Sequence, residues 1–321
     1  MFSLRQKVYQ LFILGLDGGN YRQALMDGLG GIIFFTNDIL SEEQFVSVTN
    51  ECKNIALIKP FLSIDQEGGR VERTQNIHGG KKYLSAKYAF EQNVLRQQTC
   101  DIAKELSRYG VNLNFAPCID VNTNPDNPII AERAFSSRVE DVIEAEKIVS
   151  DTYRENGILP CVKHFPGHGD ANVDSHLALP HLDLSFDEMV KNHISPFKSA
   201  IENGIEMVMV AHLHCSCFDD DVIPSSMSKN VISYLRVELG FKGVIISDDM
   251  VMKGVSDLFS PLEACVKGLK AGLNMFIFRN STSGTIKMIE DLALLAEQDV
   301  ELRNCIENSF EKILLLKEKI F

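Results

Sequence analysis

The stretch Gly243-Val-Ile-Ile-Ser-Asp-Asp249 places two carboxylates directly after a short apolar run. The run contains β-branched residues without polar alternation, as expected of a parallel strand that is buried on both faces. Similar runs occur along the whole chain, at residues 12–16, 31–35, 61–64, 113–116, 159–162, 207–211, 244–246 and 275–278. We therefore predict eight buried strands.

The segments between these runs show helical spacing of apolar residues, as at Ile102, Leu106 and Tyr109 and at Val190, Ile194, Phe197 and Ile201. Eight strand–helix units predict an α/β fold of the (β/α)8 TIM-type barrel class. No linker, low-complexity stretch or repeat interrupts the pattern, so residues 1–321 are expected to form a single catalytic barrel domain. A doubly wound parallel sheet is the alternative.

Polar residues follow almost every predicted strand. They are Asp17, Thr36-Asn37, Asp65-Gln66-Glu67, Asp120, Lys163-His164, His212, Asp248-Asp249 and Arg279-Asn280. A barrel brings the carboxyl ends of all its strands to one rim, where its active site is built. The sequence therefore predicts a polar site that draws on several strand ends.

Composition excludes some classes of partner. The formal net charge of −12 and the pI near 5.2 argue against nucleic acid, which would require a basic face. The N-terminal apolar run is too short for a membrane span or a signal sequence, so no membrane insertion is expected. Most of the eight cysteines lie within apolar runs, which indicates buried thiols and a cytoplasmic location.

Asp248 is the first candidate for chemistry, since it emerges at the end of the seventh predicted strand. A carboxylate there could be a nucleophile, a base, a metal ligand or a helix N-cap. The doublet favours chemistry, because Asp249 can cap while Asp248 faces a pocket.

The loop from 165 to 180 is the second candidate. Asp174 and His176 are close enough in sequence for the carboxylate to orient the imidazole as a general acid/base. The alternative is a solvated polar loop. Before it, Lys163 follows an apolar strand, and its ammonium could bind hydroxyls or a carboxylate, or form a salt bridge within the rim.

Two other segments contain candidate binding residues. Residues 65–73 carry paired glycines between charged side chains, which allow a close approach to a ligand, although this pattern alone is weak. Residues 212–217 contain two histidines and two cysteines, but their spacing matches no common zinc site. We expect no metal there, His212 lining the pocket, and Cys215 and Cys217 packing in the interior.

Together these motifs resemble glycoside hydrolase family 3, specifically its single-domain β-N-acetylhexosaminidases of the peptidoglycan-recycling type. The matching stretches are Asp-Gln-Glu-Gly-Gly-Arg-Val at 65–71, Lys-His-Phe-Pro-Gly-His-Gly at 163–169, Asp-Ser-His at 174–176 and Ser-Asp-Asp-Met at 247–250. The second of these is highly specific. A sugar-binding protein that has the same barrel but no catalytic activity is the alternative to an enzyme.

The resemblance implies a retaining mechanism without a cofactor or metal. In it Asp248 is the nucleophile, His176 the acid/base and Asp174 its orienting partner. It also implies substrate contacts from Asp65, Arg73, Arg133, Lys163 and His164.

The substrate implied is a terminal β-linked N-acetylglucosamine (GlcNAc) on a cell-wall fragment, with a broader β-glucosidase as the alternative. Larger relatives take their acid from a second domain. Since the chain after Phe278 is predicted to be helical, the acid is expected to come from a barrel loop.

Overall fold

The computed structural model describes residues 2–171 and 179–320. In these residues, parallel strands form one sheet in the order β5-β4-β3-β2-β1-β11-β10-β8-β6, and β7 pairs separately with β9. The strands are β1 (Phe12–Asp17), β2 (Gly31–Phe34), β3 (Phe61–Ile64), β4 (Leu113–Asn114), β5 (Leu159–Pro160), β6 (Val162–Phe165), β7 (His181–Leu182), β8 (Met207–Val210), β9 (His214–Cys215), β10 (Val244–Asp249) and β11 (Met275–Asn280).

The sheet closes into a barrel. β5 and β6 stand at opposite ends of the strand order, yet only Cys161 separates them in the chain. Because β5 pairs with β4 and β6 with β8, the chain itself joins the two edges. A parallel bridge between Cys118 and Lys163 adds to this closure. The predicted barrel is confirmed, and the doubly wound sheet, which would leave two open edges, is excluded.

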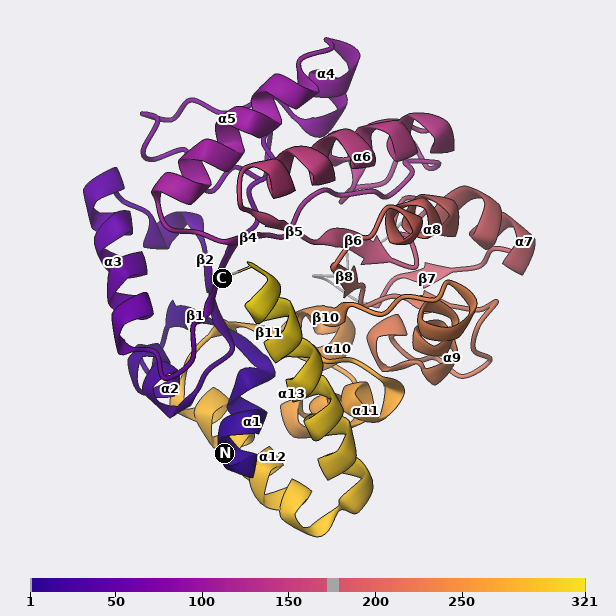
Figure 1. The fold of residues 1–321 in the computed structure, drawn as a ribbon. Helices are drawn as coiled ribbons and strands as arrows, with labels where there is room; N and C mark the ends of the chain where they lie inside the picture. Colours follow the sequence, from indigo (N-terminus) through magenta and orange to yellow (C-terminus); the bar gives the residue numbers. More distant parts are fainter. Residues whose placement is uncertain (1, 172–178, 321) are drawn as a thin grey trace.

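Helices surround the strands on the outside of the ring (Figure 1). They are α1 (Leu4–Gln10), α2 (Tyr21–Asp27), α3 (Glu42–Ile55), α4 (Ala86–Glu91), α5 (Leu95–Arg108), α6 (Val139–Glu155), α7 (Phe186–Glu188), α8 (Ser195–Glu202), α9 (Lys229–Ser233), α10 (Lys253–Ser256), α11 (Pro261–Ala271), α12 (Ser283–Gln298) and α13 (Val300–Ile320). Short 3-10 or π-helical turns are η1 (Thr36–Asp38), η2 (Ala131–Arg133), η3 (Met189–Ile194), η4 (Ser225–Met227) and η5 (Tyr234–Glu238).

Local sequence signals fix the ends of several helices. At α11 the Ser260 side chain accepts from the backbone N–H of Glu263, and the Glu263 carboxylate accepts from the N–H of Ser260. This reciprocal cap satisfies N–H groups that have no partner inside the helix. The helix ends at Gly272, whose φ of 115° is a left-handed conformation that glycine adopts without strain.

The N-terminal ends of the strands are covered by the two ends of the chain. The buried ammonium of Lys317, on α13, donates to the Gly30 carbonyl just before β2 and to the Gln10 side chain on α1. This end of the barrel is therefore packed, which leaves the carboxyl ends of the strands for a site. Among the described residues, no helix has the length and apolar character needed to cross a bilayer.

The strand boundaries differ from the prediction at one place that matters for the site. The run at 159–162 was predicted as one strand, but it breaks at Cys161, whose N–H donates to both Asn114 and Ala116 carbonyls. β6 then continues to Phe165, so Lys163 and His164 lie within a strand and not after it. Both side chains are consequently held by the barrel wall.

Candidate active site

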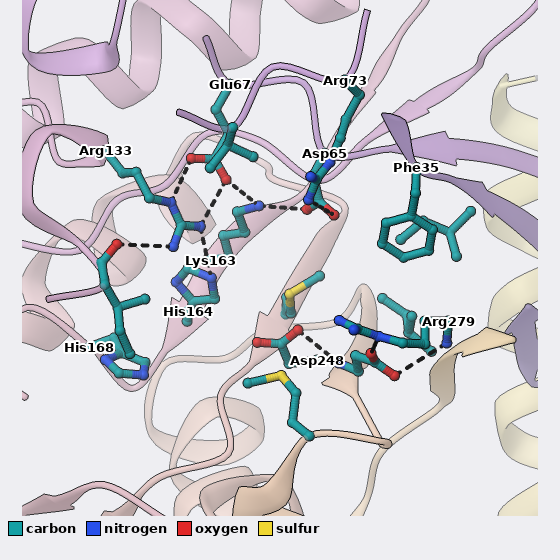
Figure 2. A pocket seen from close by; sticks show the side chains of 17 residues that line it. Phe35, Asp65, Glu67, Arg73, Arg133, Lys163, His164, His168, Asp248 and Arg279 are labelled. Atoms are coloured by element: carbon teal, nitrogen blue, oxygen red, sulfur yellow. Dashed lines mark hydrogen bonds and ion pairs between the residues drawn. The ribbon is translucent and has the colours of Figure 1, made fainter. Parts of the chain in front are cut away.

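A cavity opens at the carboxyl ends of the barrel strands (Figure 2). Six residues that were predicted for catalysis or substrate binding line this cavity: Asp65, Arg73, Arg133, Lys163, His164 and Asp248. Asp174 and His176, predicted as the acid/base pair, lie outside the described residues. The fold therefore brings these six side chains, which come from distant segments of the chain, around one cavity.

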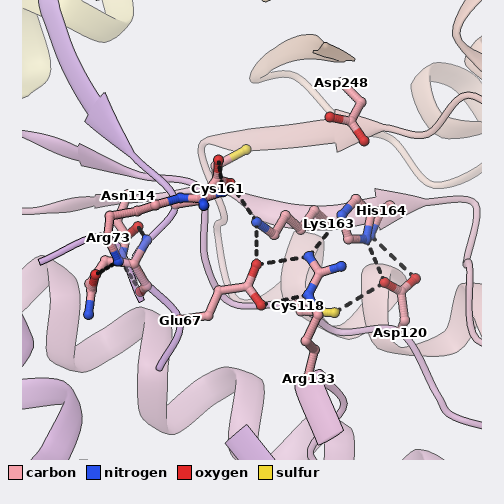
Figure 3. Close-up of polar contacts among 12 residues, drawn as sticks. Glu67, Arg73, Asn114, Cys118, Asp120, Arg133, Cys161, Lys163, His164 and Asp248 are labelled. Carbon is pink, nitrogen blue, oxygen red and sulfur yellow. Dashed lines mark hydrogen bonds and ion pairs between the residues drawn. The ribbon is translucent and has the colours of Figure 1, made fainter. Parts of the chain in front are cut away.

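Four charged side chains form a connected cluster on one wall, and Figure 3 shows Glu67, Arg133 and Lys163 among them. The Lys163 ammonium lies 2.7 Å from Oδ1 of Asp65 and 2.6 Å from Oε1 of Glu67. Arg133 binds Glu67 through both Nε and Nη2, each at 2.8 Å. These alternating charges present fixed donors and acceptors, as hydroxyl groups require.

Burial and pairing set the charge states in this cluster. Burial opposes the positive charge of Lys163, but Asp65 and Glu67 outweigh it and raise the pKa of the ammonium above its ordinary value. Burial also opposes ionisation of Glu67, yet Arg133 and Lys163 hold the pKa of its carboxyl well below its ordinary value. Lys163 and Glu67 thus hold each other in their charged forms.

His164 is fixed by a second, deeper carboxylate. Its Nδ1 lies 2.6 Å from Oδ2 of Asp120, which is fully buried. The other oxygen of Asp120 accepts from the backbone N–H of His168 at 2.6 Å. Burial opposes the charge of Asp120, but His164 and His168 lower the pKa of its carboxyl. Asp120 therefore orients a strand residue and the following loop together.

Asp248 and Asp249 divide two tasks at the end of β10. Asp249 pairs with the Arg279 guanidinium and accepts from the Val251 N–H, so it closes the turn after the strand. The Asp248 carboxylate instead accepts at 2.7 Å from the N–H of Asp249, and Figure 2 shows it facing the cavity.

The electrostatic surroundings favour an ionised Asp248. Burial opposes its charge, but the nearby imidazoles of His164 and His212, the Asp249 N–H and the Lys163 ammonium lower the pKa of the Asp248 carboxyl. The arrangement can therefore present an anionic oxygen to a ligand that is held by the charged wall.

Residues 3–316 match the glycosyl hydrolase family 3 N-terminal domain. The chain belongs to glycosyl hydrolase family 3. The resemblance seen in the sequence is thus confirmed, and with it the assignment to a family of glycosidases.

Three family 3 proteins are similar to this chain. The chain is 34% identical over 269 residues to "Beta-hexosaminidase A" of Pseudoalteromonas piscicida, covering 77% of this chain and 45% of that protein. It is 29% identical over 298 residues to "Beta-hexosaminidase" of Psychromonas ingrahamii, covering 89% and 86%. A solved family 3 beta-N-acetylglucosaminidase from a Paenibacillus species superposes with a TM-score of 0.92 at 31% identity, covering 100% of this chain and 63% of that one. The chain thus spans about half to two thirds of the first and third of these proteins.

The family 3 site also contains residues to which sequence reasoning gave no role. Glu67, His168 and Arg279 all line the cavity, and Asp120 lies directly behind it. Each of these residues lies in a quoted motif or at a predicted strand end. Its role could not be predicted because it depends on contacts with residues that are distant in the sequence. His212 was predicted to line the pocket, and this is wrong. It is buried outside the lining, with Nδ1 2.8 Å from Ser226 Oγ.

In the described residues, Cys118, Asp120 and His164 form a group whose ligand atoms lie within 4.8 Å of one another. The Cys118 thiol and the His164 imidazole both contact the same Asp120 oxygen, so hydrogen bonding within the protein already uses these atoms. All eight cysteines are free thiols, and five of them are buried.

Proposed function

We propose that this chain is a retaining exo-β-N-acetylglucosaminidase that releases terminal β-linked GlcNAc from peptidoglycan-derived muropeptides. One observation carries the proposal: an ionised carboxylate, Asp248, faces a cavity whose opposite wall is a fixed set of hydroxyl-binding charges. The β-hexosaminidase names of two relatives support the sugar, and the structural neighbour's name supports the N-acetyl group. We propose a cytoplasmic location as well, on the strength of the free thiols.

In the first step, Asp248 attacks the anomeric carbon and forms an ester with it. The bond to the leaving oxygen breaks, and His176, oriented by Asp174, gives that oxygen a proton. In the second step, His176 takes a proton from water, whose oxygen displaces Asp248 and restores the carboxylate. The stereochemistry at the anomeric carbon is retained because it is inverted twice. No metal or cofactor has a part in this proposal.

The charged wall supplies binding and orientation. Asp65, Arg73, Arg133, Lys163 and His164 are proposed to hold the hydroxyl groups of the sugar. Because these side chains are already paired with one another, they lose little freedom when the sugar binds. The anomeric carbon is then held against Asp248, which is the positioning that a nucleophilic step requires.

The test is to trap the covalent intermediate. We expect a slow fluorinated N-acetylglucosaminide to label the wild-type protein on the peptide that contains Asp248. Asp248→Asn should lose both labelling and turnover of an aryl N-acetylglucosaminide, because the amide is a poor nucleophile. The matched control is Asp257→Asn, an exposed aspartate nine residues further along, which should retain both.

Three outcomes contradict parts of the proposal. Turnover by Asp248→Asn, or a label on another peptide, removes Asp248 from the nucleophile role. Equal hydrolysis of the glucoside and the N-acetylglucosaminide indicates a broad glycosidase. Sugar binding without turnover by the wild type indicates a protein that only binds.

A further inference from the structure

His168 is a buried side chain with unused hydrogen-bonding capacity. It is only 2% exposed, and neither ring nitrogen has a hydrogen-bond partner among the described residues. Buried polar atoms without a partner are rare in folded proteins, because leaving one unpaired costs about 1–3 kcal/mol. His168 also lines the cavity, so a ligand bound there lies beside a ring whose nitrogens have no partner among the described residues.

The backbone of His168 is held on both sides, which fixes where the ring points. Its N–H donates to Asp120, and its carbonyl accepts from the Asn127 amide at 2.8 Å. The ring packs edge-on against His164, with 5.9 Å between the ring centroids. The unpaired nitrogens are therefore a built feature of the cavity wall.

The His168 ring offers one donor and one acceptor at neutral pH. Burial and the neighbouring His164 lower its pKa to about 4, although the Asp120 carboxylate acts in the opposite direction. A neutral imidazole carries one N–H and one free nitrogen lone pair. One ring nitrogen can therefore donate to a ligand acceptor and the other can accept from a ligand donor, and the two nitrogens point in different directions.

The positions of the other side chains restrict which part of a sugar reaches His168. Figure 2 shows Asp248 on one side of the cavity, the Asp65–Lys163–Glu67 cluster across from it, and His168 and Phe35 on opposite sides of the view. A pyranose with its anomeric carbon at Asp248 directs its distal hydroxyls to the cluster. Its C2 substituent and its C6 hydroxymethyl group then point to the two flanks.

The flank with His168 fits an acetamido group better than the other flank does. An acetamido group carries one N–H, one carbonyl oxygen and a methyl group. Ile129, on the loop that Asn127 ties to His168, lines the same cavity and is 8% exposed, so it offers apolar surface for the methyl group. On the opposite flank, Arg279 is a cation that Asp249 already binds.

We propose that His168 is a specificity-determining residue that hydrogen-bonds the 2-acetamido group of the sugar in the cavity, which makes the site select N-acetylated over plain hexosides. This rests on the proposed function, whose sugar it concerns. A plain glucoside carries only a hydroxyl at C2, which is shorter than an acetamido group and lacks its carbonyl oxygen, so the His168 N–H stays unpaired in that complex.

The experiment measures kcat/KM on two aryl glycosides that differ only at C2, the N-acetylglucosaminide and the glucoside. In His168→Leu, we expect the ratio of the two values to fall on the order of 10- to 100-fold, mainly through the N-acetylated substrate. His168→Asn, which keeps a donor and an acceptor, should recover part of the ratio. Inhibition constants of free GlcNAc and glucose give the same comparison without turnover of the glucoside.

His193→Leu is the matched control. His193 is also a buried imidazole with an unpaired nitrogen among the described residues, but it does not line the cavity. Its replacement should leave the ratio unchanged. The proposal is overturned if His168→Leu slows both substrates equally, which would mean that the ring only supports its surroundings. A wild-type protein that does not act on the N-acetylglucosaminide contradicts the proposed function instead.

Discussion

At the scale of single residues, Glu67 holds the charged wall of the cavity together. Its carboxylate is 5% exposed and contacts both Lys163 and Arg133, one of them through two hydrogen bonds. Lys163 has Asp65 as a second anion. Arg133 has Glu67 as its only carboxylate partner among the described residues, so Glu67 alone pairs with its buried positive charge.

Glu67→Gln should therefore destabilise the protein by about 3–5 kcal/mol, because it leaves a buried guanidinium without a compensating charge. Urea unfolding measures the change. Glu155→Gln is the control, since Glu155 pairs with Arg96 on the surface with more than half of both side chains exposed. That variant should change stability by less than about 1 kcal/mol. Equal effects of the two variants would mean that the buried cluster is not electrostatically coupled.

At the scale of elements, helix α6 packs against α5 and α8 and has a buried carboxylic acid, Glu146. Glu146 is 1% exposed, and among the described residues only one of its oxygens has a partner, the Ser150 hydroxyl at 2.7 Å. Burial raises the pKa of Glu146 to about 7, and the Ser150 hydrogen bond only partly offsets this. The helix therefore packs best when Glu146 is protonated.

The stability of the wild type should consequently depend on pH through Glu146. The folded pKa is raised above the ordinary value of 4.5, so the stabilising contribution is present below pH 4.5 and is lost as pH rises through 7. Glu146→Gln should match the wild type near pH 4.5 and be more stable by up to about 3 kcal/mol at pH 8.5. Urea unfolding at both pH values measures this. Glu144→Gln, an exposed site on the same helix, should show no such pH dependence, and a constant Glu146→Gln effect would contradict the argument.

At the scale of the whole molecule, the sheet depends on a close approach between its first and last strands in sequence, β1 and β11. The register between them shifts between Leu14 and Asp17, and Gly15 lies in this interval. A Cβ on Gly15 would lie 2.0 Å from the Arg279 carbonyl oxygen, which is a backbone atom that cannot rotate away. The glycine is therefore needed for contact between two backbones.

Gly15→Ala should destabilise the fold by at least about 3 kcal/mol, because two paired strands in the middle of the sheet must separate. Thermal unfolding monitored by circular dichroism measures the loss. Gly284→Ala is the control, since the nearest atom to a Cβ there is a Thr282 side-chain oxygen at 3.7 Å. Gly284 lies in α12, where alanine favours the helix. A Gly15→Ala variant as stable as this control would contradict the close approach.

Most of the barrel could be predicted from the chain, and the exceptions share one cause. Buried parallel strands leave an apolar signal that is continuous in sequence, and this located all eight runs. The break at Cys161 left no such signal, because the apolar run continues through it and the break arises from hydrogen bonds to another strand. The pattern of neighbouring residues in the sequence does not show that Cys161 hydrogen-bonds to Asn114 and Ala116.

The same limit applies to the site. The sequence singled out Lys163 and Asp65 at strand ends, but 98 residues separate them, and their 2.7 Å contact exists only when the strands lie side by side. Asp120 stood at a predicted strand end without a task, and it acquires one from His164 and His168. The Asp248-Asp249 doublet predicted one aspartate for the turn and one for the pocket. The ion pair between Arg279 and Asp249 shows that Asp249 belongs to the turn.

The sequence by itself determined the barrel, the family and the strand ends that carry polar side chains, because hydrophobic periodicity and specific motifs are properties of contiguous residues. Only the tertiary structure decided that Glu67 joins two cations, that Asp248 rather than Asp249 is left to face the cavity, and that the imidazole of His168 is buried without a partner among the described residues. These depend on distances and burial, which are set when separate strands meet around one closed sheet.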